Sequence, residues 1–318
     1  MQAEAGEEAT GEEAAAEEAA LKGTALVYAP TTLREQLPGL MRMARLNAIP
    51  MGAALVGFGA YGARRVAGAV ATSHRAAKLL LGMVLTCIVT AGSMLINDYH
   101  DHKLGVDNAR TKPGRPLVTG EVQPEAVKLV LKWGYATHLT LLCLVETAPM
   151  RLWVLGNTLL TYLYSVHLKP LTGVKNLVCA LIVAMAVGLG ALAVDGSLAA
   201  LAAVWRPMVA VSGLIWHREM VMDIKDMEGD SLAGVRTVPV AFGSERALLL
   251  SLLPLVGSAA AAATARTRTA ALAATLPLLL QGGLAVRAMR ARFARPRMVA
   301  AIELAPLWLA TTLVALTL

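Results

Sequence analysis

Nine segments of this chain are apolar over nearly the length of a membrane crossing, and this repetition constrains the fold more than any other feature. A helix needs about 20 mostly apolar residues to cross the hydrocarbon core of a bilayer. Glycine and alanine recur through these segments, as close packing between helices in lipid favours. We therefore predict an all-α polytopic membrane protein with nine transmembrane helices around a central cavity. The segments are 46–63, 77–97, 124–147, 151–167, 176–194, 199–222, 246–264, 269–286 and 298–317.

Composition supports a membrane protein and separates one segment from the rest. The 318 residues are 56% hydrophobic and only 16% charged, whereas soluble domains are about 25% charged. Residues 1–30 contain seven glutamates and one lysine among alanines and glycines. Such a stretch cannot bury a core, so we predict a disordered acidic N-terminal segment at 1–30, followed by one membrane domain at 31–318. No basic segment interleaved with aromatic residues is present, which argues against a nucleic-acid partner.

Two acidic clusters follow the second and sixth apolar segments. Asp98 and Asp101 are three residues apart and Asn97 precedes Asp101 by four, so all three lie near one helical face. The second cluster repeats the spacing, with carboxylates at three and four residues. Its members are Asp223, Asp226 and Asp230. Carboxylates are costly at a membrane boundary, and hard oxygen ligands suit Mg²⁺ shared with phosphates. We therefore predict a paired Mg²⁺–diphosphate site in preference to two solvated helix ends.

Topology predicts that the two clusters lie on the same side of the membrane. Four crossings separate them, and an even number returns the chain to the side from which it started. Most of the lysines and arginines between the apolar segments fall on that same side. By the positive-inside rule it faces the cytoplasm, stroma or matrix. A plastid membrane and a bacterial inner membrane both fit this orientation, and the sequence leaves the organelle open.

Cationic residues flank both clusters and could neutralise a leaving diphosphate. A Pro/Gly loop after the first cluster supplies Lys112 and Arg115, Lys169 ends the fourth segment, and Lys225 lies within the second cluster. Each alone could equally be a positive-inside anchor. Together with the acids, they predict a clamp that binds a diphosphate ester.

These motifs, in this order, resemble the UbiA-type intramembrane prenyltransferases. Asn97-Asp98-x-x-Asp101 resembles the first Asp-rich motif, and the loop 110–117 resembles the basic loop that follows it in the family. Asp223-x-x-Asp226-x-x-Gly-Asp230 resembles the second Asp-rich motif. The resemblance covers about residues 42–243 and departs from the family at Gly105, where a third aspartate is common. The further positions that match the family's motifs are Arg45, Asn47, Tyr164 with Lys169, Arg236, and Asp107 two residues after the missing acid.

The resemblance implies Mg²⁺-dependent transfer of a prenyl chain from a polyprenyl diphosphate to a lipophilic acceptor. It implies that Asp98, Asp101, Asp223 and Asp226 are catalytic. Asp107 and Asp230 would complete the Mg²⁺ ligands. It further implies substrate-binding roles, which fall on Asn97, Asn47, Arg45, Lys112, Arg115, Tyr164, Lys169, Lys225 and Arg236. Asn47 could instead join two helices.

The family favours an aromatic quinone or tocopherol precursor as acceptor, with geranylgeranylglyceryl phosphate or chlorophyllide as alternatives. A CDP-alcohol phosphotransferase would need Asp-Gly-x-x-Ala-Arg, which residues 105–110 do not supply. A cation transporter is the alternative of another class, although such proteins often place binding groups at mid-membrane. The sequence leaves the donor chain length and the oligomeric state open.

Overall fold

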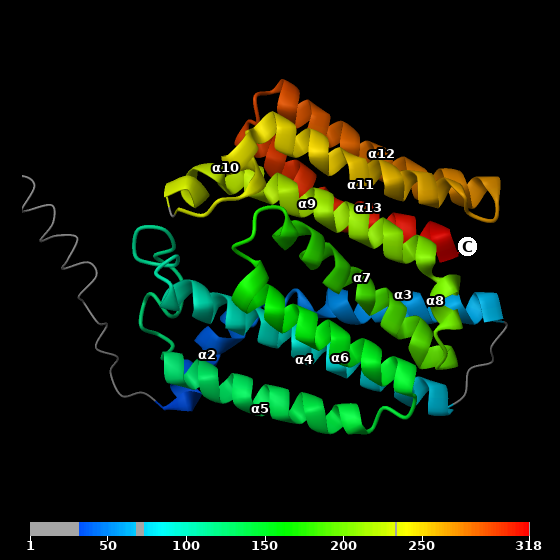
Figure 1. Ribbon diagram of the computed structural model, residues 1–318, viewed down its shortest axis with the longest axis horizontal. Coiled ribbons are helices and arrows are strands. Elements are labelled where there is room, and N and C mark those ends of the chain that lie inside the picture. The colour runs from blue at the N-terminus through cyan, green and yellow to red at the C-terminus, as the bar shows by residue number, and fades with distance from the viewer. Residues whose placement is uncertain (1–31, 68–72, 233, 318) are drawn as a thin grey trace, which may run out of the picture.

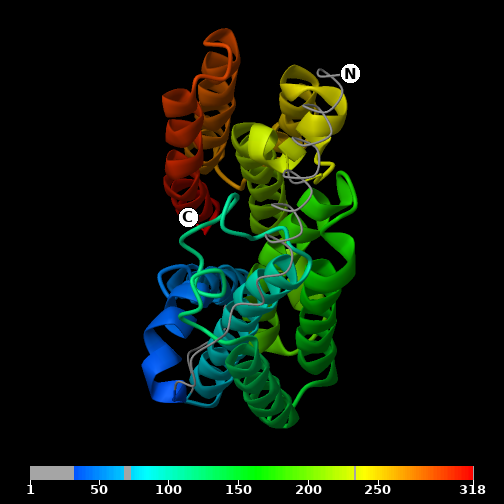
Figure 2. The same cartoon turned by 90° about the vertical axis from the view of Figure 1, so that its left-hand side faces the viewer.

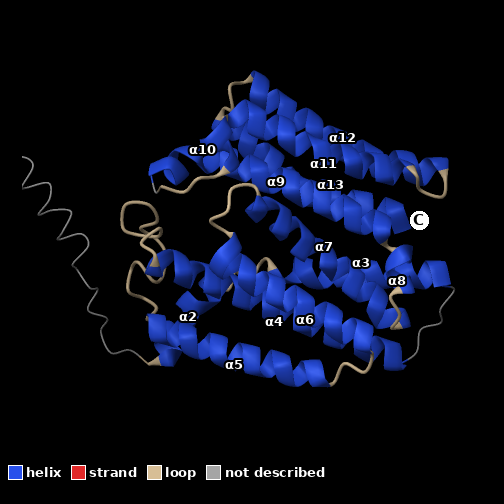
Figure 3. Cartoon of the chain, viewed as in Figure 1, coloured by secondary structure: helices blue, strands red, loops and turns tan. Residues whose placement is uncertain are grey.

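The computed structural model describes residues 32–67, 73–232 and 234–317. Within these ranges every regular element is helical (Figure 3). The long helices are α3 (Ile49–Ala67), α4 (Ser73–Lys103), α5 (Pro124–Cys143), α6 (Ala148–Leu163), α7 (Val174–Asp195), α9 (Trp205–Leu232), α11 (Ser244–Ala263), α12 (Arg268–Arg290) and α13 (Arg295–Thr317). The short ones are α2 (Leu33–Met43), the π-helical turn η1 (Tyr164–Leu168), α8 (Ala199–Ala203) and α10 (Val238–Phe242). The acidic segment predicted at 1–30 lies outside the described residues.

The long helices lie in two neighbouring groups (Figure 1). Helices α3 to α7 form one group, and α9 with α11, α12 and α13 forms the other; Figure 2 shows the same division from the side. Contacts of α7 with α9 and of α3 with α13 join the groups. The largest buried apolar cluster draws residues from both groups, including Val56 of α3, Leu192 of α7, Leu214 of α9 and Leu313 of α13.

Glycines allow the closest helix approaches in this bundle. A Cβ atom at Gly59 of α3 would overlap the carbonyl oxygen of Val187 in α7, and one at Gly190 of α7 would overlap that of Val56. Small residues let helix backbones approach where lipid provides no hydrophobic driving force for association. The α3–α7 contact is therefore fixed by two reciprocal glycines.

Each of the nine predicted segments coincides with a long helix to within a few residues, except the sixth. Residues 199–222 do not form one helix, because α8 ends at Ala203 and α9 begins at Trp205. Pro207 lies in the first turn of α9, where its missing N–H costs no helical hydrogen bond. Five helices are long and apolar enough to cross a bilayer by length and composition, namely α4, α7, α11, α12 and α13. The count of nine crossings therefore remains a prediction.

The two acidic clusters lie at the same end of the bundle, as the sequence predicts. Helices α4 and α9 both end at the left of Figure 1, next to the loop 104–123. Lys169 contacts Asp101 of the first cluster, and Lys175, six residues later, contacts Asp223 of the second. The short segment between α6 and α7 thus connects the two clusters.

Candidate active site

Asp98 is the most enclosed acid of the first cluster. Its carboxylate accepts a hydrogen bond from Arg115 Nη1 at 2.9 Å and a longer one from Arg45 Nη2 at 3.3 Å. Only 3% of its side chain is exposed, so two cations compensate a charge that could not be buried alone. Arg45, predicted at the start of the first crossing, adopts a left-handed backbone conformation with φ 49° in the turn between α2 and α3.

Gly105 accounts for the missing third acid of the first cluster. Its φ of +73° ends α4 in a left-handed turn, a conformation that aspartate adopts less readily than glycine. The turn brings the Asp107 amide to the Asp101 carbonyl oxygen at 3.1 Å. Asp107 is buried, and its Oδ2 lies 3.6 Å from Arg115 Nε. Asp98 and Asp107 thus both contact Arg115, although Asp107 lies two residues after the position where the family commonly has its third aspartate.

Asp101 faces the segment between α6 and α7. Lys169 Nζ donates to both of its carboxylate oxygens, at 2.7 Å and 2.5 Å. Lys169 follows the π-helical turn η1, and such widened turns occur often at functional sites. Tyr164 opens this turn and lies within electrostatic range of Asp101 and Asp223. The predicted Tyr164–Lys169 motif therefore lies between the clusters.

Asp223 is the enclosed acid of the second cluster. Lys175 Nζ lies 2.5 Å from its Oδ1, and the amide of Asn176 donates to its Oδ2 at 2.9 Å. Asn176 is buried with 1% exposure. Both partners come from the first turn of α7. Asp98 and Asp223 are therefore alike, because each is enclosed and accepts hydrogen bonds from two side chains that lie outside its own helix.

The rest of the second cluster is more open to solvent. Asp226 is 55% exposed and pairs with Lys225 at 3.3 Å. Burial raises the pKa of the Asp230 carboxyl, with Lys175 and Lys112 opposing the shift and the charges of Asp223 and Asp226 adding to it. The loop cation Lys112, which follows the first cluster in sequence, thus lies near the second in space.

The oxygen atoms at the first cluster fit a hard cation. Asn97 Oδ1 and Asp107 Oδ2 are buried without a hydrogen-bond partner among the described residues, and unpaired buried acceptors are costly unless something binds them. No group of three or more His, Cys, Asp or Glu side chains in the described ranges is already gathered around a metal position. Mg²⁺ commonly uses one or two carboxylates, with waters and substrate phosphates completing its shell. The donors present therefore suit Mg²⁺ that arrives with a diphosphate.

Two predicted residues are not brought to the carboxylates by any contact seen in the described ranges. Asn47 is exposed in the turn before α3, and Arg236 is exposed, its carbonyl oxygen accepting a hydrogen bond from Thr172 at 2.5 Å. Conversely, the predicted site omitted Lys175, Asn176 and Glu219. The signal for Glu219 was its position four residues before Asp223, which continues the acidic face of α9 by one turn.

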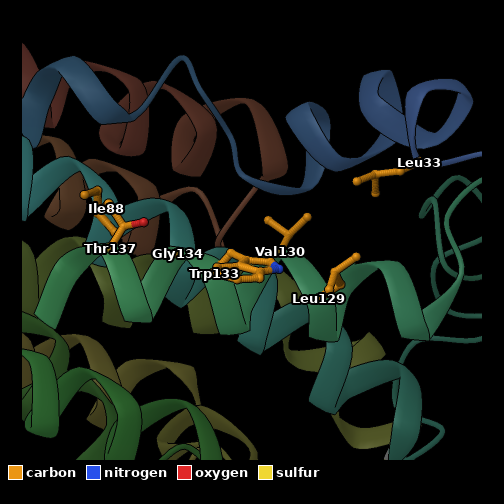
Figure 4. Close-up of a pocket in the computed structure, with 7 residues that line it drawn as sticks. All are labelled: Leu33, Ile88, Leu129, Val130, Trp133, Gly134 and Thr137. Carbon is orange, nitrogen blue, oxygen red and sulfur yellow. The ribbon is translucent and has the colours of Figure 1, made fainter. Parts of the chain in front are cut away.

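An apolar groove of about 470 Å³ lies away from the acids, between α2, α4 and α5 (Figure 4). Its walls include Leu33, Ile88, Leu129, Val130 and Trp133, the last 64% exposed. None of the clustered carboxylates lines it. The groove is therefore separate from the candidate active site.

A family model described as the UbiA prenyltransferase family matches residues 47–311. The chain belongs to the UbiA prenyltransferase family. The match includes both acidic clusters and the long helices, apart from the last six residues of α13. The resemblance predicted from the motifs is confirmed: this UbiA protein is an integral membrane enzyme that transfers prenyl groups.

Curated relatives of this UbiA protein include two archaeal proteins with the same name. It is 34% identical to the digeranylgeranylglyceryl phosphate synthase of Halobacterium salinarum over 227 residues, which are 70% of this chain and 76% of that protein. It is 32% identical to the enzyme of the same name from Methanopyrus kandleri over 176 residues, 53% of this chain. That match spans 59% of the Methanopyrus protein, less than two thirds of its length.

Solved structures of UbiA homologues share the fold. The apo structure of a homologue from Aeropyrum pernix superimposes with a TM-score of 0.66 at 20% identity, covering 85% of this chain and 98% of that one. A homologue from Archaeoglobus fulgidus, solved with DMAPP and Mg²⁺ bound, gives a TM-score of 0.56 at 19% identity, covering 88% and 99%. The predicted all-α membrane fold is confirmed.

Proposed function

We propose that this enzyme transfers a prenyl chain from a prenyl diphosphate to the free hydroxyl group of geranylgeranylglyceryl phosphate, in a Mg²⁺-dependent reaction. The names of its relatives support this acceptor over the aromatic quinone precursor that the sequence alone favoured. The reaction adds a second prenyl ether to a phosphorylated glycerol lipid. The chemistry rests on one observation: two enclosed aspartates, Asp98 and Asp223, lie at one end of the bundle and are each held by a paired cation.

The acids would hold Mg²⁺ and the donor together. We assign this role to Asp98, Asp101, Asp223 and Asp226, with Asp107 and Asp230 as further oxygen donors and Asn97 as a neutral one. When bound, Mg²⁺ supplies positive charge to the diphosphate oxygens. A homologue from Archaeoglobus fulgidus was solved with DMAPP and Mg²⁺ bound, which supports joint binding of metal and donor in a protein of this fold.

The cations that now pair with the acids are positioned to receive the leaving group. Arg115, Lys169 and Lys175 each lie within 3 Å of a clustered carboxylate oxygen, so a diphosphate bridging the acids would contact their donors. Arg45, Lys112, Lys225 and Arg236 would add charge at the rim. As the allylic C–O bond breaks, negative charge grows on the diphosphate, and each well-placed donor is worth about 10²–10³ in rate.

The apolar bundle would hold the prenyl chain away from water. The clusters occupy the helix ends, so a chain attached to a clamped diphosphate must extend toward the apolar segments. Exclusion of water protects the allylic cation until the acceptor oxygen attacks it.

A membrane assay that crosses donors with acceptors tests this function. Geranylgeranyl, phytyl and longer diphosphates would be paired with geranylgeranylglyceryl phosphate, an aromatic quinone precursor and chlorophyllide. We expect prenylated glycerol phosphate with the geranylgeranyl donor, and no product when Mg²⁺ is chelated. A preference for the aromatic acceptor would overturn the proposed acceptor while leaving the reaction class intact.

We also propose that the end carrying the site faces the cytoplasm or its equivalent. The cationic loops after α4 and between α12 and α13 lie at that end, as the positive-inside rule predicts. In a variant without native cysteines, a cysteine at Asn108 should react with a membrane-impermeant maleimide only from the cytoplasmic side. A cysteine at Arg266, at the other end, should react only from the opposite side.

A further inference from the structure

Glu219 is a fourth acid on the face of α9 that carries the second cluster. It precedes Asp223 by four residues and Asp226 by seven, so the three side chains lie on one face of the helix. Four residues rise about 6 Å along a helix, which places Glu219 about that far from Asp223 toward the middle of the bundle. The acidic face therefore extends beyond the proposed metal ligands into the apolar interior.

The surroundings of Glu219 differ from those of a packed core residue. Its side chain is 17% exposed, so neighbouring side chains do not enclose it completely. Tyr164 of η1 and Lys175 of α7 are within electrostatic range, as they are of Asp223. Glu219 therefore lies near the same phenol and ammonium groups as Asp223, about one helical turn earlier along α9.

One oxygen of Glu219 is held and the other is open. Arg218 Nη1 donates to Oε1 at 3.2 Å, and within the described residues Oε2 has no hydrogen-bond partner. Successive residues on a helix do not share a face, so this pair is not the usual helix-stabilising ion pair. The contact with Arg218 orients the carboxylate of Glu219 and leaves its Oε2 available to another group.

The proposed reaction requires a group that accepts a proton. The allylic C–O bond breaks with its electron pair leaving on the diphosphate, and the acceptor hydroxyl oxygen forms a new C–O bond with the same carbon. The oxygen then carries a proton that must leave. The clustered aspartates would be bound to the metal–diphosphate group and are weak bases there. The reacting carbon lies on the apolar side of that group, because the prenyl chain extends into the bundle.

We infer that Glu219 accepts the proton of the acceptor hydroxyl as the new C–O bond forms, with Arg218 orienting its carboxylate. The inference rests on the proposed function and adds a catalytic residue to it. The proton then passes from Glu219 to water before the next turnover. General base catalysis of this kind contributes about 10²–10⁴-fold to a rate.

A Glu219→Gln variant of the full-length protein tests the assignment, because glutamine keeps an oxygen that accepts from Arg218 but cannot take up a proton. Three quantities would be measured: Mg²⁺- and donor-dependent thermal stabilisation, diphosphate release without acceptor, and ether product with acceptor. We expect kcat for the ether product to fall at least 100-fold, with the other two quantities within about threefold of wild type. The kcat of Glu219→Asp for the ether product should be at least tenfold higher than that of Glu219→Gln. Glu228→Gln, an exposed acid on the same helix, is the matched control and should change none of them.

Two results would overturn the inference. Product formation by Glu219→Gln within threefold of wild type would show that no proton goes to this residue. A parallel loss of donor stabilisation, diphosphate release and product, without rescue by aspartate, would make Glu219 a structural part of the clamp. Failure of the proposed function itself would look different, because the wild-type protein would then release diphosphate but give no ether product.

Discussion

Lys175 Nζ lies 2.5 Å from Asp223 Oδ1, and this ion pair joins the first turn of α7 to the last third of α9. Both side chains are largely buried, with 18% of the lysine side chain and 8% of the aspartate side chain exposed. A charge at such depth is stable only with a partner. Loss of either side chain would therefore weaken the contact between the two helix groups and leave an unpaired charge in the proposed site.

Replacing Lys175 with methionine should affect both stability and activity. The substitution keeps the length of the side chain but leaves Asp223 with only the Asn176 amide, which we expect to cost about 3 kcal/mol and to lower the thermal midpoint. Adding Asp223→Asn should recover most of that midpoint without recovering prenyl transfer. Lys128 on α5 provides the control, since it is 56% exposed, lies 3.6 Å from Glu125 and 5.8 Å from the ring centre of Tyr99. Lys128→Met should keep wild-type prenyl transfer and lose no more than about 1 kcal/mol of stability.

Asp226→Asn separates a role in binding from a role in stability. This carboxylate is 55% exposed, so its loss should change the free energy of unfolding by no more than about 0.5 kcal/mol. Turnover should nevertheless fall at least 100-fold, because a Mg²⁺ ligand is lost, and stabilisation by Mg²⁺ with donor should disappear. Near-normal turnover in this variant would remove Asp226 from the proposed ligands, and Glu228→Gln again serves as the neighbouring control.

The reciprocal glycines of α3 and α7 predict a steric effect. Gly59→Ala would place a methyl group against the backbone of Val187, forcing the helices apart at a cost of about 1–3 kcal/mol. Gly156→Ala is the matched control, since no atom lies within 4 Å of a Cβ at that helical position. There, alanine should be neutral or stabilising by up to about 1 kcal/mol. Equal thermal midpoints for the two variants would contradict the close α3–α7 contact.

An ion pair at the opposite end of the bundle predicts a pH dependence. Glu146, between α5 and α6, lies 2.9 Å from Lys78 Nζ and 3.0 Å from His74 Nε2. The hydrogen bond from Lys78, with a further contribution from His74, lowers the pKa of Glu146 below its ordinary value of 4.5. Because the folded pKa is depressed, the stabilisation is present above the ordinary pKa and is lost as the pH falls through the folded value.

The thermal midpoint of Glu146→Gln should therefore lie slightly below that of wild type at neutral pH, and the two should converge once the pH has fallen below the depressed pKa of the folded state. The difference should also shrink in concentrated salt, since the carboxylate is exposed. A difference that persists at the lower pH would point to packing by Glu146 rather than to its charge.

The sequence predicted the helices well because length and hydrophobicity are local properties. The parity of the crossings placed the two clusters at one end, and the structure has them there. The break between α8 and α9 was missed, although Pro207 was its signal. The short helix α2 was also missed, although Thr32 and Glu35 form a capping box at its start.

The pairing within the site could not be predicted in the same way. Lys225 is close to Asp223 in sequence but pairs with Asp226, whereas the cation at Asp223 comes from 48 residues away. Such contacts depend on how helices pack, and spacing along one helix does not report it. The position of Asp107 likewise depends on the left-handed turn at Gly105. This turn brings the Asp107 carboxylate next to Arg115, which the spacing along the sequence does not indicate.

The cation attached to each enclosed acid has a consequence for the order of binding. Asp98 and Asp223 each have a cationic partner, so a metal ion that binds alone would have to displace a guanidinium or ammonium group. A metal–diphosphate pair offers an exchange instead, in which the acids turn to the metal and the released cations turn to the phosphates. Metal and donor should therefore bind with positive cooperativity, each raising the affinity for the other by the same factor.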